Sequence, residues 1–151
     1  SFATKSMCLF IHHRDLWEFG ERKRENMESN EITGEIINCA IKVHKTLGPG
    51  LLESVYEKCL AYELSKRGLK VEVQKEMPIV YEEIVFDKGY RIDLLVEDSV
   101  VVELKSVSEM KPIYSAQTLT YLKLAKLKVA LLINFNEILL KNGIKRLVMW
   151  L

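Results

Sequence analysis

The segment from Arg91 to Lys105 carries the residue types that are best suited to chemistry. Two apolar runs, Ile92 to Val96 and Val100 to Leu104, flank the polar tripeptide Glu97-Asp98-Ser99. This pattern predicts two strands of a β-hairpin joined by a short loop. The hairpin would hold several charged side chains in fixed positions relative to one another.

The predicted register sets two carboxylates opposite each other. If the loop is centred on Asp98, Asp93 lies across from Glu103, and Arg91 lies across from Lys105. Side chains alternate between the two faces of a strand, so Asp93, Glu103 and Lys105 share one face. The apolar residues share the other face: Ile92, Leu94, Val96, Val100, Val102 and Leu104.

Two facing carboxylates repel each other unless a cation lies between them. Hard oxygen ligands suit Mg²⁺, whose remaining positions are filled by water and by substrate phosphate. The arrangement therefore predicts a metal-dependent phosphodiesterase site. The alternative is a surface carboxylate pair that is balanced by Arg91 and Lys105.

This hairpin and the motifs around it resemble the PD-(D/E)XK nuclease superfamily. An Asp followed by Glu-x-Lys on the next strand is the superfamily pattern, and Gly50-Leu-Leu-Glu53-Ser-Val-Tyr56 looks like the signature of its GxxExxY branch. The other similar stretches are Val43 to Gly50, Gln74, Gln117-Thr-Leu-Thr-Tyr121 and Leu131 to Phe135. The resemblance runs from about Ile32 to Val148 and implies a restriction-endonuclease-like core.

The resemblance also implies a metal-binding set. Asp93 and Glu103 would hold the metal, Glu53 would reach it from an N-terminal helix, and the backbone carbonyl of Leu104 would complete the coordination. Glu57, one turn after Glu53, is a weaker candidate.

Further roles follow from the same resemblance. Lys105 would position the attacking water or stabilise the developing charge, and Gln117 would orient Lys105 or a phosphate. Tyr121 shares a helix face with Gln117 and would contact it or the DNA backbone. Tyr114 stands where this branch often has a His and is a candidate nucleic-acid contact, as is Arg146 on charge alone.

Some residues have ordinary structural interpretations. Ile92 stands where the superfamily nominally has Pro, which is a variable position. Tyr56 is expected to pack with its hydroxyl near the site, and His44 to cap the end of its helix. The role of Gln74 is open.

Hydrophobic periodicity predicts an α/β domain with the element order α-α-β-β-β-α-β-β around a mixed central sheet flanked by helices. The predicted helices are Ile32 to Leu47, Leu51 to Arg67 and Ile113 to Ala125. Outside the hairpin, the predicted strands are Lys70 to Lys75, Ile79 to Phe86, Lys128 to Phe135 and Ile144 to Trp150.

Length and composition are those of an ordinary globular chain. It has 151 residues, of which 48% are hydrophobic and 28% charged, and no apolar run approaches the roughly 20 residues that span a bilayer. Three cysteines, Cys8, Cys39 and Cys59, are better suited to reduced thiols than to a disulfide framework, so we expect a cytoplasmic protein.

Charge divides the chain unequally. Residues 105–151 carry eight Lys and Arg against two acids, a net +6, whereas the rest is −5. A basic C-terminal part suits a phosphate backbone, although a solvated helix face would have the same composition.

Residues 1–29 differ from the domain predicted over 30–151. The run Gly20-Glu-Arg-Lys-Arg-Glu-Asn26 has no apolar periodicity and reads as a polar linker or an exposed helix. Alternatively, it is a translated ribosome-binding site, with Met27 as the native start.

These observations predict a nuclease that depends on Mg²⁺, with Mn²⁺ able to substitute, and that hydrolyses nucleic acid, with DNA the expected substrate. The alternative function is a non-catalytic or partner-dependent nucleic-acid-binding module on the same fold. A homodimer that pairs across the short terminal strand is a further expectation.

Overall fold

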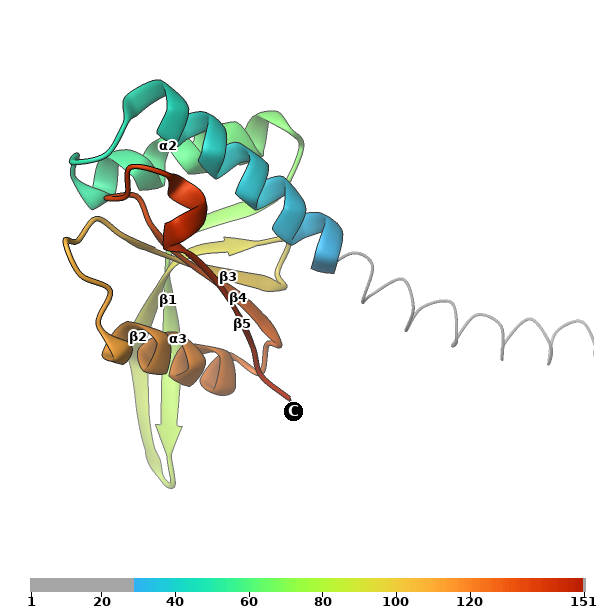
Figure 1. Ribbon diagram of the computed structural model, residues 1–151. Coiled ribbons are helices and arrows are strands. Elements are labelled where there is room, and N and C mark those ends of the chain that lie inside the picture. The colour runs from blue at the N-terminus through green and yellow to red at the C-terminus, as the bar shows by residue number, and fades with distance from the viewer. Residues whose placement is uncertain (1–28, 151) are drawn as a thin grey trace, which may run out of the picture. The chain divides into compact units, whose positions relative to one another are not determined.

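The computed structural model describes residues 29–150 (Figure 1). The predicted N-terminal extension, including His12, His13 and Met27, lies outside the described residues except for residue 29. From Ile32 onward the chain forms one compact unit. Among residues 29–150, no helix is both long enough and apolar enough to cross a bilayer.

The elements follow the predicted order of types. A first helix covers residues 29–47 of the described chain. It is followed by α2 (Glu53–Lys66), β1 (Val71–Tyr81), β2 (Ile84–Val96), β3 (Val100–Lys105), α3 (Pro112–Ala125), β4 (Val129–Asn134), the short 3-10 helix η1 (Leu140–Gly143) and β5 (Ile144–Val148). Gly68 lies just beyond the end of α2 with a φ of +81°, a backbone angle that is common where helices stop.

The five strands form one mixed sheet in the order β1-β2-β3-β4-β5. Only β3 and β4 pair in parallel, and α3 makes the crossover between them. The other neighbours are antiparallel. This is the restriction-endonuclease-like α/β architecture that the sequence predicts.

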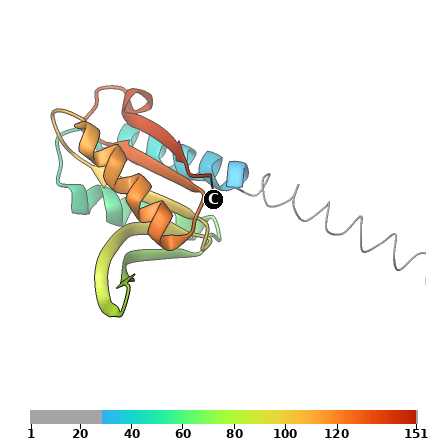
Figure 2. The ribbon, with the colours of Figure 1, turned by 90° about the horizontal axis from the view of Figure 1, so that it is seen from below.

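Helices cover both faces of the sheet (Figures 1 and 2). On one face, the first helix and α2 pack Ile36, Leu60 and Leu64 against alternate residues of β2, β3 and β4. On the other face, Leu122 of α3 packs with Leu95, Val101 and Ala130. All six residues of β4 are buried because helices cover both of its sides.

The hairpin register agrees with the prediction. Val96 pairs with Val100, Leu95 with Val101 and Leu94 with Val102, so the loop is centred on Asp98. The β2–β3 ladder ends at the pair Leu94–Val102, so it includes neither the predicted pair Asp93–Glu103 nor the predicted pair Arg91–Lys105. Lys105 pairs with Asn134 of β4 instead.

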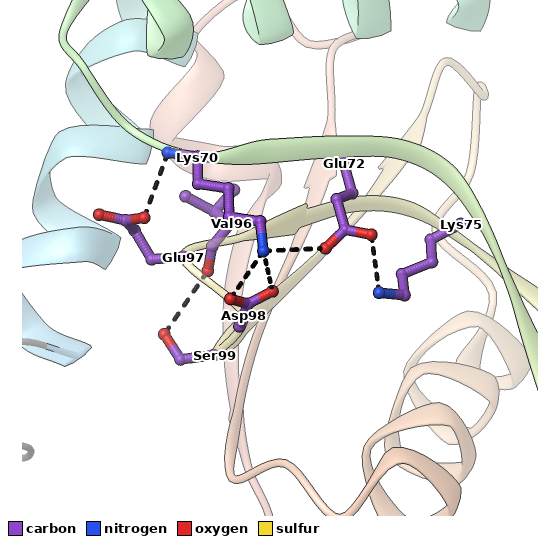
Figure 3. A network of polar contacts seen from close by, with 7 residues as sticks. All are labelled: Lys70, Glu72, Lys75, Val96, Glu97, Asp98 and Ser99. Carbon is purple, nitrogen blue, oxygen red and sulfur yellow. Dashed lines mark hydrogen bonds and ion pairs between the residues drawn. The ribbon is translucent and has the colours of Figure 1, made fainter.

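A polar network fixes the loop end of this hairpin (Figure 3). The Lys70 ammonium contacts both oxygens of Asp98 at 3.0 Å, and Glu72 bridges between Lys70 and Lys75. Glu97 and Asp98 adopt left-handed backbone angles, which these contacts help to hold. Lys70 and Asp98 are solvent-exposed, whereas Glu72 and Lys75 are partly buried, so the contacts contribute more to register than to stability.

Two predictions about the strands are wrong. Ile79 to Phe86 is not one strand, because a turn at Glu82, whose φ is +52°, divides it between β1 and β2. Ile92 does not share a face with Leu94. It packs in the α3-side cluster with Leu95 and Val101, because strand alternation is interrupted at Asp93.

Candidate active site

Asp93 and Glu103 meet where the β2–β3 ladder ends. The Asp93 backbone N–H donates to Glu103 Oε1 at 3.2 Å, and the Leu104 N–H donates to Asp93 Oδ2 at 3.0 Å. At this point the Asp93 and Leu104 N–H groups donate to carboxylate oxygens rather than to backbone carbonyls of the neighbouring strand. Asp93 and Glu103 therefore lie beside each other, as the sequence predicts, but they are not paired in the β2–β3 ladder.

Glu103 is an unusual carboxyl group because it is only 5% exposed. Burial, followed by the negative charge of Asp93, raises the pKa of Glu103 to about 9. Lys105 opposes that shift only weakly. A cation bound beside this buried carboxyl group would stabilise its ionised form.

Gln74 connects Asp93 to α2. Its Nε2 donates to Asp93 Oδ1 at 3.2 Å and also to Glu57 Oε2. Gln74 has a φ of +52° and is absent from the regular β1–β2 register, which runs from Val73 directly to Lys75. This left-handed residue is the physical reason for the irregular strand geometry beside Asp93.

Glu53 and Glu57 bring α2 to the same place. Burial raises the pKa of Glu53, Lys105 lowers it and Asp93 raises it further, so both groups lie within electrostatic range. Burial also raises the pKa of Glu57, which the Gln74 hydrogen bond partly offsets. The structure therefore gathers both acids, including Glu57, which the sequence ranked second.

The loop before α2 is held by Tyr56. Its hydroxyl donates to the Gly48 carbonyl at 2.6 Å and accepts from the Leu51 N–H at 3.1 Å. Its ring stacks on Phe135, with centroids 4.4 Å apart. Gly50 has a φ of +90°, which a residue with a side chain rarely adopts. Tyr56 therefore packs as the sequence predicts, and its hydroxyl holds the loop that leads into Glu53.

Lys105 lies under an aromatic residue of α3. Its ammonium is 4.6 Å from the centre of the Tyr114 ring, a cation–π contact. Tyr121 lies near the acids as well, since burial and then the charges of Glu103 and Asp93 raise its pKa. Gln117 is exposed on α3 between these two tyrosines at helical spacing, so all three share the face that borders the site.

Sequence reasoning missed two residues. Asn134, only 1% exposed, bonds to both the N–H and the carbonyl of Val107 and so anchors the loop after Lys105. Its position at the buried end of β4 was the available signal. The Tyr90 ring packs against the Tyr121 ring, with ring centroids 4.8 Å apart. The Tyr90 hydroxyl is buried without a hydrogen-bond partner among the described residues.

Two other residues lie elsewhere. His44 contacts the Glu137 carbonyl at 2.7 Å through Nε2 and the Phe135 ring, which is a structural role with a partner outside its own helix. Arg146 pairs with Leu131 on edge strand β5, two strands from Val102, and is not brought into the acidic group.

The donors around Glu103 are hard oxygens of the kind that divalent cations prefer. Among residues 29–150, no three or more His, Cys, Asp and Glu side chains already form a metal-binding cluster. The acids nevertheless fit a cation. Burial and the negative charge of Asp93 disfavour the ionised form of Glu103, and a bound cation would stabilise that form.

The comparisons with known proteins identify the family. The sequence profile of the PD-(D/E)XK nuclease superfamily matches residues 30–147. No curated protein matches the chain. No solved structure matches it either. The profile spans all but the last residue of the sheet and includes Asp93, Glu103 and Lys105, and the chain belongs to the PD-(D/E)XK nuclease superfamily.

Proposed function

We propose that this domain is a nuclease that depends on a divalent cation and hydrolyses phosphodiester bonds of DNA. The observation that carries the proposal is the buried Glu103 beside Asp93, with Lys105 two residues further along the same strand. Superfamily membership supports the nuclease chemistry. Cytoplasmic location stays a prediction.

In this proposal, Asp93 and Glu103 hold Mg²⁺, and Mn²⁺ substitutes for it. Glu53 and the Leu104 carbonyl add further oxygens, while water and substrate phosphate complete the coordination. The bound cation would neutralise phosphate charge and acidify an attacking water. To hold a cation, Glu103 would have to be ionised, since ligand carboxylates are deprotonated, and burial raises its pKa to about 9.

The other residues orient and balance charge. The Lys105 ammonium, held by the Tyr114 ring, stabilises charge that develops on the phosphate. Gln74 keeps Asp93 and Glu57 in fixed positions through two hydrogen bonds. Gln117 and Tyr121, from the bordering face of α3, contact the phosphate backbone.

We also propose that the chain belongs to the GxxExxY branch. The structure gives each motif residue a task that supports this: Gly50 allows the turn, Glu53 begins α2 towards the acids, and Tyr56 ties the loop.

A cleavage assay tests the function. Purified protein is incubated with linear, circular, single-stranded and branched DNA in the presence of Mg²⁺, Mn²⁺ or EDTA. We expect metal-dependent cleavage that Lys105→Ala lowers by about a hundredfold or more, because a positioned charge at the phosphate is lost. The control is Lys66→Ala, at the far end of α2 and near the exposed Tyr62 ring, which should cleave like wild type.

Two results would refute the proposal. One is cleavage that continues unchanged in EDTA. The other is cleavage that Lys105→Ala leaves intact. DNA binding without cleavage on every substrate would instead establish the alternative, a binding module on the same fold.

A further inference from the structure

Exposed apolar side chains stand at the starts of the two helices that border the acids. Leu52, directly before Glu53 and α2, is 73% exposed, and Ile113, in the first turn of α3, is 63% exposed. Leu51 is 40% exposed. Leu51, Leu52 and Ile113 are here called the apolar rim. Exposed apolar side chains are ordinary when they are scattered, so their placement around one site decides whether they have a task.

The α2 part of the rim is tied to Glu53 and to the residue after Lys105. The Ser106 hydroxyl donates to the Leu51 carbonyl at 2.6 Å. Burial raises the pKa of Glu53, and a hydrogen bond from the Ser106 backbone partly offsets that rise. Because Ser106 directly follows Lys105, these contacts hold the loop that carries Leu51 and Leu52 beside the site.

The α3 part of the rim lies beside Lys105. The Lys105 ammonium is 4.6 Å from the centre of the Tyr114 ring, and Ile113 is the preceding residue. Ile113 also stands four positions before Gln117, so the two share one face of α3. Figures 1 and 2 both show the starts of α2 and α3 at the same end of the sheet. The rim therefore contributes side chains from both helices that border the acids.

This placement selects what the rim contacts. The proposed function, on which this inference rests, brings a substrate phosphate to Glu53 and Lys105. The groups next to a phosphate in nucleic acid are its sugars and bases, so side chains one position away from Glu53 and Tyr114 lie where the neighbouring bases are. A base offers an apolar face only when it is unpaired, because a duplex covers these faces and presents its phosphates instead.

Charge around the rim suits a nucleic-acid strand. Lys111 directly precedes α3, and α3 itself contains no acidic residue. Between Glu109 and Glu137 the chain carries four lysines and no acid, and none of the four forms an ion pair within residues 29–150: Lys111, Lys123, Lys126 and Lys128. A strand beside the rim therefore meets uncompensated positive charge from this part of the chain.

We propose that the apolar rim holds unpaired bases next to the bound phosphate, so that the substrate class is single-stranded nucleic acid or the unpaired part of a branched or frayed duplex. Aliphatic side chains form no hydrogen bonds with base edges. The rim therefore selects unpaired strands without selecting a base sequence.

Fluorescence anisotropy of the full chain in EDTA tests the proposal with three probes: an oligonucleotide of mixed sequence, the same strand annealed to its complement, and a strand of equal length whose sugars carry no bases. We expect wild type to bind the single strand about tenfold or more tightly than the abasic strand, and more tightly than the duplex. Leu52→Gln/Ile113→Gln should weaken binding of the single strand about fivefold or more and leave binding of the abasic strand unchanged, because the phosphate contacts remain.

The matched control is Ile84→Gln/Val85→Gln at the outer end of the β1–β2 hairpin. These residues are 54% and 61% exposed, but Glu82 and Glu83 beside them repel phosphate, so this variant should bind all three probes like wild type. Circular dichroism melting checks that each variant is folded.

Four results would overturn the proposal: no binding of the single strand, equal binding of strands with and without bases, tighter binding of the duplex, or equal losses on both strands in the rim variant. Each is measured without metal and so judges the substrate class alone. A protein that shows the expected preference but cleaves nothing with Mg²⁺ would refute the nuclease proposal and leave the role of the rim standing.

Discussion

At the scale of single residues, Glu103 is the central feature of the protein. It is buried beside Asp93 without a nearby compensating ion pair, because Lys105 directs its ammonium at the Tyr114 ring. A folded state that keeps such a group is less stable than one with a neutral residue there. The stability of the metal-free protein should therefore reveal the site.

The pH dependence of stability has a definite sign. Glu103 releases its proton near pH 4.5 when unfolded but only near pH 9 when folded. Between these values the folded state binds the extra proton, so stability falls as pH rises through this window. At about pH 8 in EDTA, Glu103→Gln should be more stable than wild type by about 1 kcal/mol or more, and the gap should narrow towards about pH 5.

Urea unfolding at both pH values measures this difference. Glu109→Gln, at an exposed loop position, is the control and should follow wild type at both. A Glu103→Gln protein that is less stable than wild type at the higher pH would mean that Glu103 is a well-compensated structural carboxylate.

At the scale of elements, the loop between the first helix and α2 sets where Glu53 lies. Tyr56→Phe keeps the stacking on Phe135 but removes the hydroxyl that bonds to Gly48 and Leu51. We expect a loss of about 1–2 kcal/mol in unfolding free energy, since two partly buried hydrogen bonds to the loop are lost. Nuclease activity should fall as well, because Glu53 follows this loop.

The matched control for that prediction is Tyr62→Phe on the same helix, where the tyrosine is exposed and its ring contacts the Lys66 ammonium. It should change neither stability nor activity. If Tyr56→Phe cleaved DNA at the wild-type rate, the loop would have no part in positioning Glu53.

The sequence predicted elements better than irregularities. Helix boundaries and the loop centred on Asp98 follow from apolar periodicity and turn residues, and the structure confirms them. The left-handed backbone of Gln74 leaves no such signature, so its links to Asp93 and Glu57 could not be foreseen. The change of face at Ile92 escaped prediction for the same reason.

At the scale of the whole molecule, the sequence did not predict which strands are buried in the sheet and which project from it as the outer part of the β1–β2 hairpin. Val129 to Asn134 is a nearly continuous apolar run, and Ile79 to Phe86 is apolar except for Glu82 and Glu83, so the sequence predicts a strand over each. In the structure, helices cover both sides of β4, whereas nothing in the described chain covers the tip of β1 and β2. Only tertiary packing distinguishes a core strand from an exposed one.

The proposed function depends on how the helices on the two faces of the sheet approach the acids. On one side of the sheet, α2 brings Glu53 and Glu57 to the candidate site. On the other side, α3 brings Tyr114, Gln117 and Tyr121. The acids of β2 and β3 lie between them. The central claim is that this convergence makes Asp93 and Glu103 a divalent-cation site.

Calorimetric titration of the metal-free protein with Mg²⁺ and Mn²⁺ tests that claim most directly. Performed in two buffers with different ionisation enthalpies, it also counts protons. The account predicts cation binding at neutral pH with release of about one proton, from Glu103, and loss of binding in Asp93→Asn. Absence of binding, or equal binding by wild type and Asp93→Asn, would contradict it.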